Sequence, residues 1–294
     1  MRAELIRLTL GGSEHVLRAY GTFYALAFVL SPLLAAWVAS RRGPGGRRAL
    51  MVYAGALASG IAGARALDLF VAGGLYAEDP SRIWGLSFTG FSLYGGLVLA
   101  TLAAIALARA LRQPVWRLAD SAVPGLVLGL VLMRVGCFLN GCCFGRITDL
   151  PWGVVYPAGS PAWTHQLTTG AGGVLGTLLG TVRPVHPTQL YEMAGALACG
   201  AAAWWLMRRR APDGVPFLAF ALGFTLVRLG NHFLRAWTNT ITAPPWFYPA
   251  FYVTLALVIA AVLGWRIYRA AAEKRPMHDG PPTPPLPPPQ ADRG

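Results

Sequence analysis

Charged residues are scarce in this chain of 294 residues. Asp, Glu, Lys and Arg together make up 13% of the sequence, whereas hydrophobic residues make up 55%. A soluble domain carries roughly 25% charged residues. The scarcity of charge leaves too few polar side chains to cover a water-soluble globule, and it indicates a chain that lies mostly in lipid.

Cysteine is also scarce. Four cysteines, Cys137, Cys142, Cys143 and Cys199, are too few for a disulfide scaffold in a chain of this length. Three of them follow a C-x4-C-C spacing, which lacks the C-x2-C pair of many zinc sites. We expect small packing side chains here, and neither a metal nor a cofactor. The alternatives are a disulfide, or a metal site completed by His186 or His232.

Acidic residues are about half as frequent as basic ones, 12 against 25, and the formal net charge is +13. In a soluble protein such a charge indicates nucleic-acid binding. Here the arginines stand in short clusters between apolar runs, which is the topology signal of a membrane protein. We therefore expect membrane lipid, and no nucleic acid, as a partner.

Long apolar runs are abundant, and a run of about 20 residues spans a bilayer core of roughly 30 Å. We predict an all-α fold over residues 1–275, a polytopic membrane helix bundle with about seven transmembrane helices. Residues 276–294 contain eight prolines and are expected to form a disordered cytoplasmic tail. The predicted spans are residues 19–39, 50–71, 91–110, 119–139, 189–207, 214–233 and 247–268.

The basic residues predict the orientation of the bundle. Fifteen Arg and Lys residues fall in the first, third and fifth loops and after the last span, against seven on the other side. Loops rich in Lys and Arg stay in the cytoplasm. We therefore expect the N-terminus outside and the C-terminus inside.

Four charged residues interrupt the apolar runs: Arg65, Asp68, Arg134 and Arg228. A charge at the bilayer centre costs at least about 3 kcal/mol, so each should face a cavity or a partner. Arg65 and Asp68 are three residues apart and are expected to pair. Arg134 and Arg228 have no acidic neighbour in sequence, which favours an anionic ligand such as phosphate. The alternative is pairing with Glu192 across helices.

A glycine-rich segment, RVGCFLNGCCFGR, runs from Arg134 to Arg146. Gly136, Gly141 and Gly145 are expected to break the helix and to permit close backbone approach, and Asn140 offers both donors and acceptors. Non-helical backbone at membrane depth is tolerated where it lines a cavity or is buried in protein. The segment therefore predicts one wall of a polar cavity.

A second polar segment, HPTQLYE, covers residues 186–192. Pro187 suits the start of a helix, with His186 near its cap. Gln189, Tyr191 and Glu192 then fall in its first turns. We expect these side chains to form a polar rim on the cavity that Arg134 faces.

At these residues the sequence resembles the prolipoprotein diacylglyceryl transferases, a family of bacterial membrane enzymes. RAYG (18–21) is similar to the family's aromatic-Tyr-Gly element, and YGGL (94–97) is similar to its H-G-G-L element. RVGCFLNGCCFGR resembles the signature G-R-x-G-N-F-x-N-G-E-x-x-G, and HPTQLYE is nearly identical to H-P-S/T-Q-L-Y-E. VRLGNHFLR (227–235) is a weaker match to F-R-x-x-x-E-x-x-R.

The resemblance implies transfer of a diacylglyceryl group from phosphatidylglycerol to the thiol of a lipobox cysteine in a prolipoprotein. It implies a multi-pass protein of the bacterial inner membrane, with its active site toward the outer side, that binds phosphatidylglycerol and prolipoprotein signal peptides. The roles that it suggests are phosphate binding by Arg134 and Arg228 beside Gly145 and Gln189, head-group orientation by Tyr20 and Asn140, support by His186 and Glu192, and a place beside the thiol for Tyr94.

The sequence also departs from the family pattern. Tyr94 replaces a His that is the candidate base for the thiol, and tyrosine has an unperturbed pKa near 10. Cys137 and Cys142 replace the signature Asn and Glu, and His232 replaces an acidic residue. His186 or His232 could serve as the base instead. The alternatives are a divergent paralogue with another acceptor or phospholipid, and a redox or metal protein built on the cysteines.

Overall fold

The computed structural model describes residues 4–10, 13–71, 92–171, 173, 179–236 and 244–273. The side chains of residues 4–17, 71 and 92–94 lie outside this description. The predicted tail, residues 276–294, also lies outside it.

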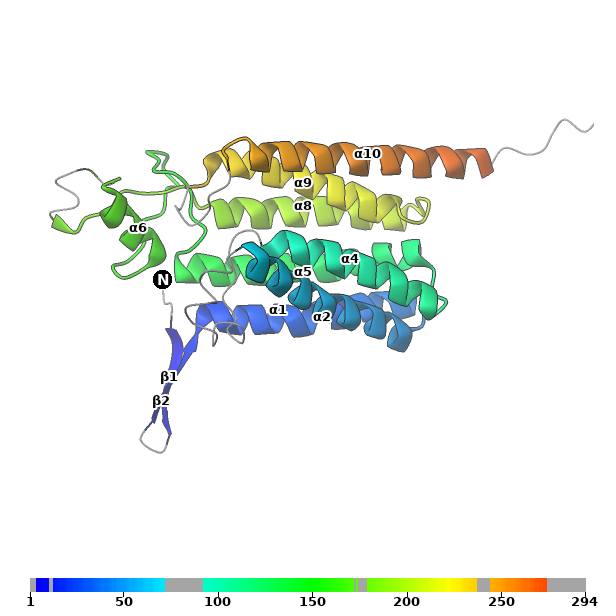
Figure 1. Cartoon of the computed structure of the whole chain (residues 1–294), viewed down its shortest axis with the longest axis horizontal. Helices are drawn as coiled ribbons and strands as arrows, with labels where there is room; N and C mark the ends of the chain where they lie inside the picture. Colours follow the sequence, from blue (N-terminus) through cyan, green and yellow to red (C-terminus); the bar gives the residue numbers. More distant parts are fainter. Residues whose placement is uncertain are drawn as a thin grey trace, which may run out of the picture.

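Long helices dominate the described part of the chain and run roughly side by side (Figure 1). Each coincides, within a few residues, with one of the apolar runs predicted from the sequence. They are α1 (Ala19–Arg41), α2 (Gly46–Val71), α4 (Ser92–Ala110), α5 (Val115–Asn140), α8 (Thr188–Arg208), α9 (Val215–Leu234) and α10 (Phe247–Glu273).

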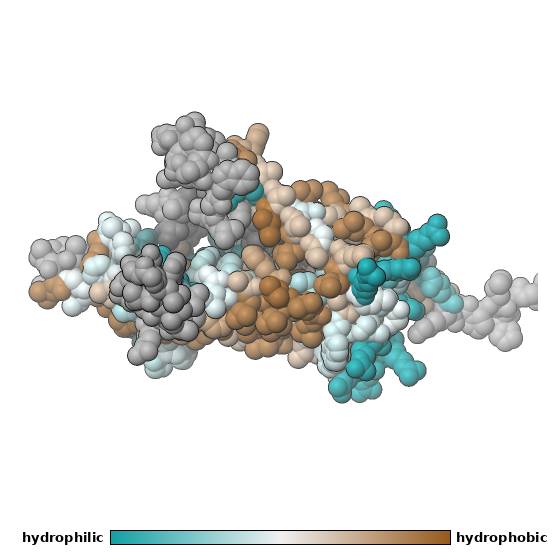
Figure 2. Space-filling view, turned by 90° about the horizontal axis from the view of Figure 1, so that it is seen from below, coloured by the Kyte–Doolittle hydropathy of each residue, from teal (hydrophilic) through white to brown (hydrophobic). Residues whose placement is uncertain are grey.

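Among the described residues, five helices are long and apolar enough to cross a membrane: α1, α2, α5, α9 and α10. Residues Gly95–Ala110 of α4 form a shorter apolar helix. Large apolar side chains such as Val98, Leu102 and Leu257 are more than half exposed. Figure 2 shows an apolar band over the middle of the helices and hydrophilic residues at one end. These features support a polytopic membrane protein.

The prediction of an all-α fold is wrong at the N-terminus, where β1 (Glu4–Leu10) and β2 (Ser13–Arg18) pair antiparallel. The hairpin projects beside the start of α1 (Figure 1). Its signals are present in the sequence, since apolar and polar residues alternate in IRLTL and two glycines separate the strands. Alternation of this kind suits a strand because successive side chains point to opposite faces.

The helices pack in the order α4, α2, α1, α5, α8, α9, α10, and α5 also contacts α9. Small residues allow the close approaches. Gly125 of α5, for example, lies so near the Ser31 carbonyl of α1 that a Cβ atom would collide with it. This packing places α5, α8 and α9 together in the middle of the molecule.

A buried carboxylate fixes α9 against α5. Asp120, only 1% exposed, accepts hydrogen bonds from the backbone N–H groups of Gly214 (2.8 Å) and Phe217 (2.9 Å). These are among the first N–H groups of a helix, which have no partner within the helix itself. Asp120 therefore caps α9 from a neighbouring helix.

The two ends of the bundle differ in chemistry. The short connections after α1, α4 and α8 lie at one end, together with the C-terminal end of α10 (Figure 1). The last turns of α1, α4 and α8 carry the exposed Arg41, Arg109 and Arg208 at this end, and the connection after α8 carries the exposed Arg210. The opposite end carries the segment between α5 and α8, including α6 (Pro161–Thr169). The polar segments singled out in the sequence meet at this second end.

Candidate functional site

One carboxylate joins the two arginines that interrupt the apolar runs. Glu192 of α8 lies 2.5 Å from Arg134 Nη2 of α5 and 2.8 Å from Arg228 Nη1 of α9, one guanidinium on each of its oxygens. All three side chains are largely buried, with Glu192 only 3% exposed. The predicted alternative, that Glu192 pairs with both arginines across helices, is confirmed.

Two neutral side chains complete this cluster. Asn231 of α9 donates to Glu192 Oε1 (2.7 Å) and to the Thr188 carbonyl (3.2 Å). Arg228 Nη2 donates to the Tyr252 hydroxyl of α10 (3.0 Å). Four helices therefore hold the charged groups in place.

The charges in this cluster do not balance. Two guanidinium groups face a single carboxylate, so the Arg134–Glu192–Arg228 group has a net charge of +1 in a largely buried setting. An excess buried charge needs a further partner. The arrangement therefore still favours an anionic ligand, even though neither arginine is unpaired.

Arg65 and Asp68 behave as predicted. Their side chains approach to 3.8 Å within α2, and Asp68 is 2% exposed. This pair accounts for two of the four charges within the apolar runs.

The first turn of α8 holds the loop that follows α5. Thr188 Oγ1 donates to the Cys143 carbonyl (2.6 Å), and Gln189 Nε2 donates to the Cys142 carbonyl (2.6 Å). Gln189 Nε2 also lies 3.1 Å from the Tyr156 hydroxyl, where burial raises the pKa of Tyr156 to about 12. Gln189 is 1% exposed. Because its amide is buried against the loop, the side chain holds the loop in position.

Gly145, a predicted binding residue, lies where this loop crosses α8 and α9. Its N–H donates to the His186 carbonyl (2.9 Å). A Cβ atom at this position would lie 2.5 Å from His186 Cβ and 2.7 Å from the Leu234 carbonyl oxygen. Close packing therefore requires glycine here.

His186 lies beside the same crossing and is half-buried. Its Nδ1 lies 3.2 Å from the Tyr191 hydroxyl, which also accepts a hydrogen bond from Trp152 Nε1 (2.8 Å). These contacts orient the His186 ring beside the first turn of α8.

Tyr20 opens α1 at this end and is 38% exposed. Its ring lies against that of Tyr24 at a centroid distance of 4.3 Å and a tilt of 32°, and the Tyr24 hydroxyl lies 3.6 Å from Cys137 Sγ. Tyr20 is thus linked through Tyr24 to the final turn of α5.

Two other predicted site residues are placed less fully. Asn140 is the last residue of α5, directly before Gly141, whose φ of +71° ends the helix. The prediction that Gly136 breaks the helix is wrong, because α5 continues through it, although Gly136 does permit a close approach to Phe23 of α1. Tyr94 lies in the first turn of α4, and its side chain is outside the described part of the structure.

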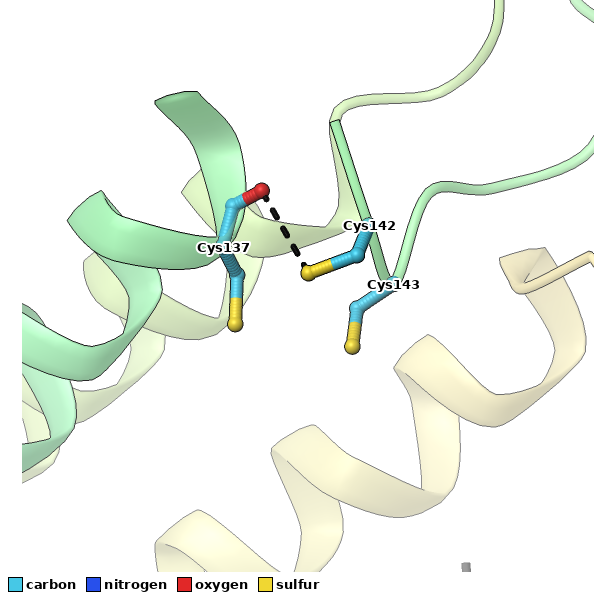
Figure 3. Close-up of side chains that lie close together, drawn as sticks. All are labelled: Cys137, Cys142 and Cys143. Atoms are coloured by element: carbon cyan, nitrogen blue, oxygen red, sulfur yellow. Dashed lines mark hydrogen bonds between the residues drawn. The ribbon is translucent and has the colours of Figure 1, made fainter. Parts of the chain in front are cut away.

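Three thiols gather at the end of α5 (Figure 3). The Sγ atoms of Cys137, Cys142 and Cys143 all lie within 4.8 Å of one another, and all three cysteines are free. The chain turns at the end of α5, where Gly141 has a φ of +71°, and this turn brings Cys142 back near Cys137. Cys143 itself adopts a φ of +61°, which is uncommon for a residue with a side chain. Hydrogen bonds from the Cys137 and Cys142 thiols hold the pKa of Cys143 well below its usual value. The prediction that these cysteines are small packing side chains did not include their meeting in one cluster, and the alternative of a disulfide is wrong, because all three are free.

Sequence reasoning also missed several residues of the site. Asn231 stands three residues after Arg228 on the same helix, so helical spacing could have revealed it. Thr188 lies inside the segment HPTQLYE, but its hydrogen bond goes to the Cys143 carbonyl in the loop after α5, and the segment alone does not predict that contact. Tyr24 and Tyr252 read as ordinary aromatic residues of apolar helices, and no local signal distinguishes them.

Comparison with known proteins agrees with the resemblance seen in the sequence. Residues 8–274 match the family model of prolipoprotein diacylglyceryl transferase. The chain is 34% identical over 179 residues to the phosphatidylglycerol–prolipoprotein diacylglyceryl transferase of Rhodopirellula baltica, covering 58% of this chain and 36% of that protein. It is 31% identical over 225 residues to the enzyme of that name from Geobacter sulfurreducens, covering 74% and 77%. For Pasteurella multocida the identity is 29% over 224 residues, covering 74% and 75%.

Proposed function

The chain belongs to the prolipoprotein diacylglyceryl transferase family, and we propose that it transfers the diacylglyceryl group of phosphatidylglycerol to the thiol of a lipobox cysteine in prolipoproteins. The relatives with 74% coverage of this chain are named for these two substrates. The observation in the molecule that carries the proposal is the shared carboxylate, which gathers two arginines into a buried group of net positive charge.

In this reaction the phosphate of the lipid is the leaving group, so negative charge develops where Arg134 and Arg228 offer fixed cations. Each guanidinium has five N–H donors, more than Glu192 and Tyr252 occupy. Fixed donors in a site from which water is excluded stabilise a developing charge most strongly. Glu192 acts here as a positioning residue that keeps the two cations at a set separation.

The acceptor thiolate attacks the glyceryl carbon that bears the phosphate. A carbon–sulfur bond forms, the carbon–oxygen bond to phosphate breaks, and glycerol 1-phosphate leaves with the electron pair. Tyr20 and Asn140 orient the head group, Gly145 and Gln189 shape the loop against it, and His186 supports the rim. Tyr94 stands beside the reacting thiol.

The proposal includes the placement of the protein. Residues 1–275 form one transmembrane domain with about seven spans in the bacterial inner membrane, the N-terminus outside and the C-terminus inside. The arginine-rich end of the bundle faces the cytoplasm, because basic loops are retained there. The charged cluster then lies toward the outer side, where the signal peptides of exported prolipoproteins are accessible.

Complementation tests the activity directly. The gene is expressed in a bacterial strain depleted of its own transferase, and the mass of a reporter lipoprotein is followed. We expect the precursor to gain a diacylglyceryl group. An unmodified precursor in cells whose membranes contain the protein would contradict the proposal and favour another acceptor or phospholipid.

Single substitutions test the phosphate assignment in the same cells. Arg134→Ala and Arg228→Ala should each lower transfer by about 100–1,000-fold, the usual effect of removing one stabilising donor. Arg183→Ala is the matched control, because Arg183 pairs with Asp149 at an exposed site and should leave transfer unchanged. Near-normal transfer by both site variants would refute the assignment.

A further inference from the structure

The three thiols at the end of α5 have the geometry of a metal site with one position left open. We propose that Cys137, Cys142 and Cys143 bind a zinc ion through three thiolates, and that the fourth coordination position takes the acceptor thiol. The second half of this inference rests on the transferase function proposed above.

The distances between the sulfur atoms fit zinc. A Zn–S bond of about 2.3 Å in tetrahedral geometry separates the sulfurs by about 3.8 Å. The three Sγ atoms already lie within 4.8 Å of one another, so no pair has to close by more than about 1 Å. Soft thiolate ligands favour Zn²⁺, and three protein ligands with an open fourth position are typical of a catalytic rather than a structural site.

The neighbouring residues hold the three cysteines in place before any metal binds. Thr188 and Gln189 fix the carbonyls of Cys143 and Cys142 at 2.6 Å each, and the left-handed backbone at Cys143 turns its thiol toward Cys137. Cys137 is fully buried, whereas Cys142 and Cys143 are half-buried, so an acceptor thiol would reach the ion from their side. Outer contacts of this kind orient the ligands of a metal.

The electrostatics of the surroundings also suit the ion. Zinc with three thiolates has a net charge of −1, and the adjacent Arg134–Glu192–Arg228 group has a net charge of +1. Arg134 links the two, because its Nη1 lies 3.9 Å from Cys137 Sγ. The cationic group thus lowers the cost of burying the negative zinc–thiolate centre, while the remaining N–H donors of the two guanidinium groups stay available to the phosphate.

The position gives the ion a chemical task. A thiol that coordinates zinc loses its proton, and the thiolate is the nucleophile. On binding, the acceptor thiol releases its proton to water and remains on the ion as thiolate. Its sulfur then bonds to the glyceryl carbon as the carbon–oxygen bond to phosphate breaks, and glycerol 1-phosphate leaves beside Arg134. Zinc keeps its oxidation state throughout.

Metal content and cobalt spectra of the purified full-length protein test the site without any turnover. We expect about one zinc per chain by mass spectrometry of the metal, and thiolate-to-metal charge-transfer absorption after exchange for Co²⁺. Cys143→Ser should abolish both signals, whereas Cys199→Ser, which changes a free cysteine on α8, should retain them. Thr188→Val should weaken zinc binding by about 10–100-fold, and Thr188→Ser should restore it.

The open position is tested with a lipobox peptide added to the cobalt protein. The cysteine peptide should increase the charge-transfer absorption, and the same peptide with serine should not. Wild-type protein that holds no metal and gives no cobalt signal would overturn the proposal. So would a disulfide within the cluster, zinc binding that survives Cys143→Ser, or a spectrum unchanged by the cysteine peptide.

Transfer assays separate this proposal from the transferase function. Full activity in chelator-treated, zinc-free protein would refute the zinc role and leave the function standing. A zinc protein that binds the cysteine peptide but transfers no diacylglyceryl group would refute the function and leave the metal site standing.

Discussion

Arg134 Nη2 lies 2.5 Å from Glu192 Oε2, and the second oxygen of the same carboxylate is shared with Arg228 and Asn231. One acidic side chain of α8 therefore orders groups from two other helices, α5 and α9. A carboxylate accepts several hydrogen bonds at once, so Glu192 keeps two cations close together that would otherwise repel each other. The site for an anion is thereby assembled before the ligand arrives.

Glu192→Gln should expose this repulsion. The amide keeps the shape of the side chain but leaves two buried guanidinium groups without a negative partner, and loss of one member of a buried ion pair costs about 3–5 kcal/mol. The free energy of unfolding of the detergent-solubilised protein should therefore fall by about 3–5 kcal/mol. Glu273→Gln, at the exposed end of α10, is the control and should change nothing. Equal stability of the two variants would contradict the assembly role of Glu192.

Asn231→Leu should weaken the same cluster by a smaller amount. It removes the donor to Glu192 and to the Thr188 carbonyl, and a buried group left unsatisfied costs about 1–3 kcal/mol. Thr225→Val is the control on the same helix, because the Thr225 hydroxyl bonds only the Ala221 carbonyl of α9 among its described contacts. Thermal unfolding of the two variants makes the comparison. An Asn231 variant as stable as the Thr225 variant would show that Glu192 does not depend on it.

Asp120→Ala should loosen α9 from α5. The substitution removes the acceptor for the N–H groups of Gly214 and Phe217, and loss of a cap costs about 0.5–2 kcal/mol. Hydrogen exchange at the start of α9 should rise. Asp149→Ala removes an exposed carboxylate and should stay within about 0.5 kcal/mol of the parent. Unchanged exchange at Gly214 and Phe217 in the Asp120 variant would rule out the cap.

Local signals predicted most of the fold because each long helix coincides with its own apolar run, as with 119–139 and α5. The hairpin was missed because its alternation is short and stands next to a longer helical run. Within the site, Arg134 and Arg228 were found because charge in an apolar run is costly, and Glu192 was found because it belongs to the polar segment HPTQLYE. Their shared geometry and the cap by Asp120 depend on contacts between distant segments, which spacing within a single segment does not reveal. The three thiols belong to one segment, but they meet because the backbone is left-handed at Gly141 and Cys143, and the C-x4-C-C spacing does not predict that conformation.

Gly145→Ala tests whether close packing of the loop on α8 and α9 sets the geometry of the site. The new methyl group would meet His186 Cβ at 2.5 Å, the Leu234 carbonyl oxygen at 2.7 Å and Thr188 Cγ2 at 2.8 Å. Two of these neighbours belong to the backbone or its first side-chain atom, so the loop itself has to shift. Overpacking of this kind costs about 1–3 kcal/mol.

Gly230→Ala is the matched control on α9, because its Cβ would meet nothing within 4 Å. It should leave stability unchanged or raise it by about 0.5–1 kcal/mol, since alanine favours a helix over glycine. Thermal unfolding and reporter lipidation are measured on both variants to decide whether close packing at Gly145 is required. A Gly145 variant that matches the Gly230 variant in both measurements would show that the loop can move away without loss, and that the position of the Cys142–Cys143 carbonyls does not matter for transfer.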